Sequence, residues 1–171
     1  TKVALYFSAK GSTLPVWVEI RPMINGYPSS TDILPGSFKL LNPEQVVVSS
    51  DASAATFFEF EEPIYLNSYT EYAVTVLSND PDYFVYKAKL GEFALNTTER
   101  RFGRQSFLGS LFKSQNASTW TAAQEEDLKF KLFRAEFTSN EGQAVFKNAS
   151  LPERILPSDP IEFFYNDSDY Y

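Results

Sequence analysis

The chain has 171 residues, of which 43% are hydrophobic and 16% aromatic, and it contains no Cys and no His. This length suits one globular domain with a sizeable core. Without Cys or His, disulfides, thiol nucleophiles, Ser-His-Asp triads and zinc or haem sites of the usual nitrogen and sulfur ligand type are excluded. We therefore expect neither an enzyme nor a bound cofactor.

The net charge is −7, from 22 acidic and 15 basic residues. An acidic domain repels a polyphosphate backbone, so nucleic acid is not an expected partner. No stretch approaches the roughly 20 consecutive apolar residues of a membrane-spanning helix, and no membrane partner is expected. The opening Thr1-Lys2-Val3 is typical of neither a signal peptide nor an initiator sequence, so we expect the chain to begin inside a longer polypeptide.

Short strands joined by turns are predicted along most of the chain, because ten prolines and seven glycines leave little room for long helices. Apolar and polar residues alternate in residues 15–21 and 128–132, as in strands with one buried face. The pattern favours an all-β fold, an antiparallel two-sheet β-sandwich of the jelly-roll kind. The other strand candidates are residues 3–8, 37–41, 45–49, 56–61, 71–78, 83–90, 107–113, 143–147 and 161–165.

Local signals add one hairpin, one helical turn and a core. The turn formers of residues 79–82 separate residues 72–78 from 83–86, which should pair antiparallel. Thr121 is a candidate N-cap for a short helical turn at 122–127. The period-2 triplets predicted to be buried are Val16, Val18 and Ile20, Tyr72, Val74 and Val76, and Leu128, Phe130 and Leu132.

The last part of the chain changes in character. We expect a β-sandwich domain at residues 1–149 and an extended C-terminal connector at 150–171, which leads into a further region of a longer polypeptide. The aromatic residues Phe163, Phe164 and Tyr165 find no core position in the predicted sandwich. They are therefore candidate interface residues.

Five stretches of the chain together resemble a known module. They are VALYFS (3–8), LPVWVEIRPMINGYP (14–28), YTEYAVTVLS (69–78), SLFKSQNASTWT (110–121) and EDLKF (126–130). They resemble, in order, a β-sandwich module of large virion structural proteins of contractile-tailed, T-even-like marine cyanophages. The resemblance implies a place in the tail, baseplate or fibre apparatus of a virion assembled in the bacterial host cytoplasm, and it supplies no catalytic residue.

Both tryptophans are candidate ligand or interface residues. Trp17 shares a strand face with Glu19 and Arg21, and an outward Trp stacks well on a sugar ring or a partner protein. Trp120 follows a polar loop whose amides and hydroxyls suit carbohydrate. The alternatives are that Trp17 packs under a loop or the second sheet and that Trp120 caps the core.

Acidic residues offer weak candidates for chemistry. Asp80 and Asp82 flank a proline in a turn and are weak metal candidates, because two carboxylates fall short of the six to eight oxygens that calcium takes. Three glutamates at 59–62 form no pair across a cleft, as a glycosidase needs, and are expected on a solvated strand edge.

The basic cluster Arg100, Arg101 and Arg104 lies in a predicted loop. It either docks an acidic surface of a neighbouring subunit or is simply solvated. Four sequons, at residues 96, 116, 148 and 166, are discounted because the motif arises readily by chance in this Asn- and Ser-rich chain. The leading expectation is a non-enzymatic structural module that contacts other segments or subunits of a virion, and the alternative is a carbohydrate-binding adhesion module of a phage or secreted protein.

Overall fold

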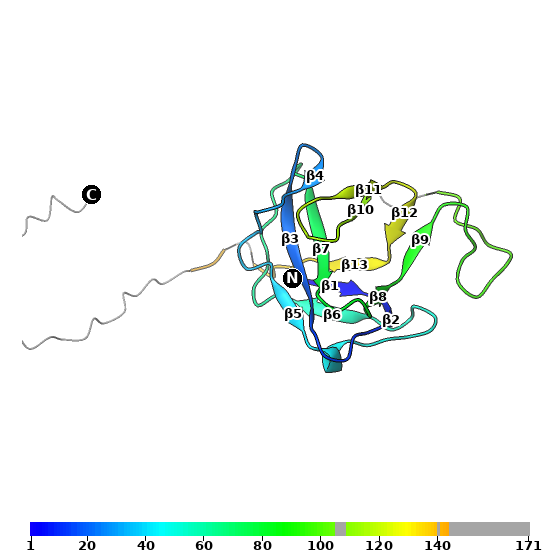
Figure 1. Ribbon diagram of the computed structural model, residues 1–171. Coiled ribbons are helices and arrows are strands. Elements are labelled where there is room, and N and C mark those ends of the chain that lie inside the picture. The colour runs from blue at the N-terminus through cyan, green and yellow to red at the C-terminus, as the bar shows by residue number, and fades with distance from the viewer. Residues whose placement is uncertain (105–108, 140, 144–171) are drawn as a thin grey trace, which may run out of the picture. The chain divides into compact units, whose positions relative to one another are not determined.

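The computed structural model describes residues 1–104, 109–139 and 141–143, and it divides into compact units at Thr1–Glu136 and Phe137–Tyr171. Of the described residues, 38% lie in strands and 2% in helix, which confirms the all-β class. The first unit contains β1 (Lys2–Leu5), β2 (Phe7–Ala9), β3 (Val16–Ile24), β4 (Tyr27–Pro28), β5 (Lys39–Leu41), the 3-10 turn η1 (Pro43–Gln45), β6 (Thr56–Glu59), β7 (Tyr72–Ser78), β8 (Phe84–Val85), β9 (Lys87–Lys89), β10 (Leu111–Lys113), β11 (Thr121–Ala123), β12 (Glu126–Leu128) and β13 (Phe130–Phe133) (Figure 1).

The strands form several small antiparallel sheets. β1 lies between β13 and β6, and β3 pairs with β4, β5 and β7. Three further two-stranded pairs are β2 with β8, β9 with β12 and β10 with β11. The longest pairing joins β3 to β7 over seven residue pairs, from Val16↔Ser78 to Pro22↔Tyr72. This long ladder makes β3 and β7 the frame of the candidate sites.

One apolar cluster joins the β1 and β3 sheets. Side chains from β1, β2 and β6 meet side chains from β3 and β5, and alternate residues of each strand point into the same interior. The cluster consists of Val3, Leu5, Phe7, Val16, Val18, Ile20, Leu41, Val46, Phe58 and Phe60.

The predicted core is confirmed for β3 and only partly for the other two triplets. Val16, Val18 and Ile20 are buried, whereas the β7 triplet and the first two residues of the third triplet are half-buried against the cluster. The predicted burial of Leu132 is wrong. This side chain is 59% exposed on β13, which is paired only with β1 in the described part of the chain. The half-buried residues are Tyr72, Val74, Val76, Leu128 and Phe130.

The predicted hairpin of residues 72–78 with 83–86 is wrong. β7 pairs with β3, and β8 pairs with β2. In the β3 ladder, Val74 lies opposite Ile20 and Val76 opposite Val18, so β7 extends an apolar face that already belongs to the core. A two-residue β8 offers no comparable burial.

The predicted helical turn at 122–127 is also wrong. The segment forms β11 and β12, separated by a turn, and each strand pairs over three residues with a partner. A single helical turn fixes several residues for very few hydrogen bonds, whereas strand pairing satisfies the same groups across a ladder. Residues 45–49 likewise form no strand: Gln45 is the last residue of η1, and Val48 makes one isolated bridge with Phe7.

Some sequence predictions fall outside the described residues. These are the domain boundary at 149/150, the connector at 150–171, the strand at 161–165 and most of the strand at 143–147. Over the part of the chain that is described, no helix has the length and apolar character needed to cross a bilayer.

Candidate functional site

Both faces of β3 are buried, although the sequence predicted one. Glu19 and Arg21 retain 3% and 6% exposure on the face opposite the apolar cluster. The loop between β10 and β11 contacts this face, because the Arg21 Nη1 donates to the Ala117 carbonyl at 2.8 Å. The Arg21 guanidinium also lies 5.8 Å from the centre of the Trp120 ring.

Glu19 and Arg21 form a buried ion pair. The Arg21 Nε donates to the Glu19 Oε1 at 2.6 Å, and the Arg21 Nη2 contacts the same oxygen. The Arg21 Nη1 donates to the Ser29 carbonyl at 2.8 Å as well as to Ala117. One guanidinium therefore ties β3 to two separate loops, and we assign this pair a structural role.

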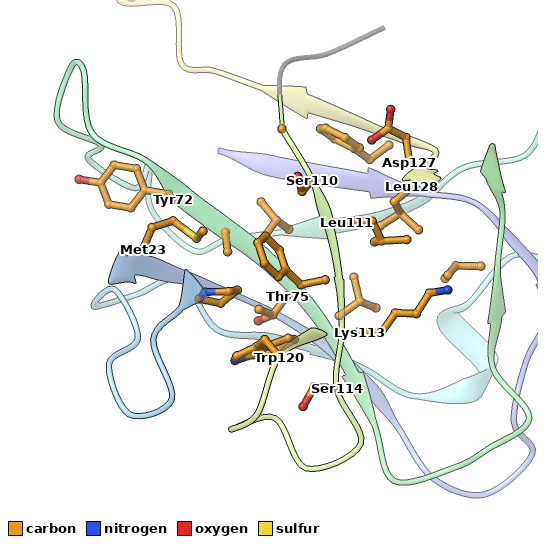
Figure 2. Close-up of a pocket in the computed structure, with 18 of the residues that line it drawn as sticks. Met23, Tyr72, Thr75, Ser110, Leu111, Lys113, Ser114, Trp120, Asp127 and Leu128 are labelled. Atoms are coloured by element: carbon orange, nitrogen blue, oxygen red, sulfur yellow. The ribbon is translucent and has the colours of Figure 1, made fainter. Parts of the chain in front are cut away.

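A pocket of about 790 Å³ lies along β7. Residues 72–77 line one side and residues 109–114 another, and Figure 2 shows Tyr72 and Met23 at one end and Asp127 and Leu128 at the other. Its volume lies within the roughly 300–1,000 Å³ of ligand pockets in proteins. The lining is mostly apolar, which is typical of sites that hold a ring or an aliphatic chain.

The two candidate tryptophans lie in different places. Trp120 lines the pocket beside Thr75, as Figure 2 shows, and its indole Nε1 is buried without a hydrogen-bond partner in the described part of the chain. Trp17 is half-buried on β3 opposite Leu40 and Leu77 and does not line the pocket. The structure thus joins Trp120, but not Trp17, to a possible ligand site.

Two lysines converge on one carboxylate near the pocket. The Glu126 Oε2 lies 2.5 Å from the Lys113 Nζ and 2.9 Å from the Lys87 Nζ. The hydrogen bonds from Lys113 and then Lys87 lower the pKa of Glu126 from 4.5 to about 2, and the bond to Glu126 raises the pKa of Lys113. Sequence reasoning missed this cluster, because its members come from β9, β10 and β12.

The Glu126 cluster makes stability dependent on acid pH. Because the pKa of Glu126 is lower in the folded chain, its contribution is complete above about pH 4.5 and is lost as the pH falls toward 2. We expect an NMR titration of the Glu126 carboxyl carbon to show a midpoint near 2. Lys113→Met should move that midpoint up toward 4.5. Lys89→Met, which removes a partner of Glu92 instead, should leave it unchanged, and an ordinary midpoint in the parent chain would contradict the cluster.

The weak metal candidates Asp80 and Asp82 take part in the hydrogen bonds of a turn. The Asp80 Oδ1 accepts a hydrogen bond from the backbone N–H of Asp82 at 3.0 Å, and the Ser78 hydroxyl accepts one from the Asp80 N–H. A carboxylate that closes a turn in this way is common where the chain reverses. The described residues contain no group of three or more acidic side chains placed to hold a metal ion. The glutamates at 59, 61 and 62 are exposed, as predicted.

The three arginines belong to a structured loop. We call residues 90–104, which follow β9 in the sequence and precede β10, the arginine loop. This loop extends away from the sheets (Figure 1). Phe93 and Arg101 form an antiparallel bridge, and the Arg101 guanidinium lies 4.0 Å from the Phe93 ring centre and donates to the Gly91 carbonyl. All three arginines are exposed, and Arg101 in addition shapes the loop.

The arginine loop also exposes apolar side chains. Phe93 is 43% exposed, Leu95 50% and Phe102 38%. No carboxylate among the described residues lies within ion-pair distance of any of the three arginines. An exposed apolar group rimmed by unpaired charge is the usual composition of a protein interface. The candidates Phe163, Phe164 and Tyr165 lie outside the described residues.

Comparisons with known proteins place the chain in no family. No protein-family model matches it, and neither a curated protein nor a solved structure is significantly similar to it.

Proposed function

We propose that the chain is a non-enzymatic structural module of a phage virion, located in the tail or baseplate apparatus. The proposal has two supports. One is the resemblance of the five stretches to a virion module, which is an expectation from the sequence alone, and the other is an arginine loop suited to docking on the β domain. In this role the module folds as a rigid block and holds neighbouring chains, and we propose a two-sheet sandwich as its architecture.

The arginine loop is the observation that carries the docking role, whereas the place in a virion is what the resemblance of the five stretches implies. Its three arginines are exposed and have no carboxylate partner in the described structure, and three apolar side chains of the same loop are partly exposed to solvent. Burying those side chains against a partner is favourable by about 25 cal/mol per Å² of apolar surface. Arginine is enriched at the centres of interfaces because its planar group binds carboxylates through two hydrogen bonds and stacks on aromatic rings.

The proposed location is tested on intact particles. Electron cryomicroscopy of particles of a phage that encodes this sequence should locate the β domain in the tail or baseplate, with Phe93 and Leu95 covered by a neighbouring chain. Hydrogen exchange of residues 90–104 should slow in the particle relative to the isolated chain. A virion without this chain, or an arginine loop fully exposed in the particle, would contradict the proposal.

A second candidate function is carbohydrate binding in the pocket along β7. The observation that favours it is that Tyr72 and Trp120 line one pocket, together with Thr75 and two lysines, since aromatic faces stack on sugar rings and polar groups orient them. A glycan array probed with the purified chain tests this function. Binding that Trp120→Ala abolishes and Trp17→Ala retains would support it, and no binding to any glycan would exclude it.

A further inference from the structure

We infer that the arginine loop of one copy binds residues 157–171 of a neighbouring copy, so that the chain assembles head to tail. The inference rests on the proposed docking function and names the partner of that surface. It is carried by a match of charge and aromatic content between two parts of the same sequence.

The arginine loop supplies the positive partner. Arg100 and Arg104 are exposed, and neither has a carboxylate partner among the described residues. Of the two acidic residues in the loop, Glu92 already lies 3.6 Å from the Lys89 Nζ. The exposed faces of Phe93 and Leu95 lie in the same loop, so the surface is both cationic and apolar.

Residues 157–171 supply the negative partner. Their sequence, PSDPIEFFYNDSDYY, holds four acidic residues, five aromatic residues and no Lys or Arg. The segment accounts for −4 of the net charge of −7, which leaves −3 for the other 156 residues. Carboxylates and aromatic rings are the two groups that guanidinium binds best, the first through paired hydrogen bonds and the second through its face.

An exposed acidic group elsewhere is a weaker partner. Residues 59–62 contain three glutamates but only one aromatic residue, Phe60, which is 6% exposed. That group offers charge without exposed rings. We therefore assign the arginine loop to residues 157–171. Because the two partner surfaces differ, each copy can bind one neighbour through its loop and another through its segment, which gives a ring or an open filament.

Charge reversal on the full chain tests this inference. One variant carries Arg100→Glu and Arg104→Glu, which leaves Arg101 to shape the loop, and the other carries Glu162→Lys and Asp167→Lys. Sedimentation should show concentration-dependent association of the parent chain that weakens with salt, since exposed charges are screened beyond about 10 Å at 0.1 M salt. Each variant alone should associate at least tenfold more weakly. An equimolar mixture should regain association, because each reversed surface then meets its opposite.

Two control variants show whether the loss is specific. Lys131→Glu with Arg134→Glu makes the same charge change as the loop variant at two exposed positions outside the loop and should associate as the parent does. Reversal of Glu59, Glu61 and Glu62 to Lys should also leave association intact, and circular dichroism should show all variants folded.

Three results would overturn the inference. These are a parent chain that stays monomeric at all concentrations, a mixture that fails to recover association, and loss of association on reversing residues 59–62. A monomeric chain whose arginine loop is nevertheless covered in the virion by a different protein would leave the proposed function standing.

Discussion

Phe58→Ala should destabilise the chain by about 3–5 kcal/mol, the usual cost of removing a buried phenyl ring and leaving a cavity. Phe58 is fully buried on β6, pairs across the ladder with Val3 and lies with its ring centre 6.4 Å from that of Phe7. A loss of this size is a large part of the stability of a domain, which is about 5–15 kcal/mol. Urea unfolding followed by tryptophan fluorescence measures it.

The neighbouring Phe57 gives the matched control. It is the same residue type on the same strand, but it points to the other face and is 48% exposed. Its contacts are with Phe133 and the Lys2 ammonium at the sheet surface. Phe57→Ala should therefore cost less than about 1 kcal/mol, in the range of surface ring contacts. Equal losses for the two variants would show that the β6 faces are assigned wrongly.

The alternation of apolar residues predicted the interior face of β3 because it is a local property of the strand. Val16, Val18 and Ile20 repeat every second residue and are buried, as period-2 sequences require when one face packs on a core. The burial of the opposite face of β3 could not be predicted from the local sequence. Glu19 and Arg21 look like solvent-facing residues, and their burial depends on contacts with Ser29 and with the distant 114–120 loop.

Strand partners were harder to predict than strands. The segments 72–78 and 83–86 are extended as expected, yet they pair with β3 and β2 rather than with each other. A turn signal shows that the chain reverses, but the partner is decided by which apolar face a strand completes, and this depends on residues 50 to 78 positions away. For the same reason, the β7 pocket and the convergence of Lys87 and Lys113 on Glu126 could not be derived from sequence.

The arginine loop shows the opposite case. Its basic cluster stands out in an acidic chain, and the sequence placed Arg100, Arg101 and Arg104 in a loop, where the structure has them. What the sequence did not reveal is that Arg101 packs on Phe93 and fixes the loop shape. The three arginines therefore have two roles, one structural and one suited to docking.

Glu19→Ala should destabilise the chain by about 3–5 kcal/mol, because it leaves a buried guanidinium without its counter-charge. Glu19 and Arg21 are both nearly inaccessible, and the two carbonyls of Ser29 and Ala117 cannot neutralise a full positive charge. Urea unfolding of this variant measures the cost of breaking the pair.

The double variant Glu19→Leu with Arg21→Met removes the ion pair without leaving an unpaired buried charge. Comparing it with Glu19→Ala therefore distinguishes the cost of losing the pair from the cost of the unpaired charge. Replacing both ions by apolar residues of similar size removes the desolvation penalty together with the attraction, so the double variant should be clearly more stable than Glu19→Ala. It still loses the two bonds from Arg21 to the loops. We therefore expect near-ultraviolet circular dichroism of Trp120 to change, because the guanidinium beside its ring holds the 114–120 loop to β3. A double variant as unstable as Glu19→Ala would mean that packing, and not the unpaired charge, dominates this site.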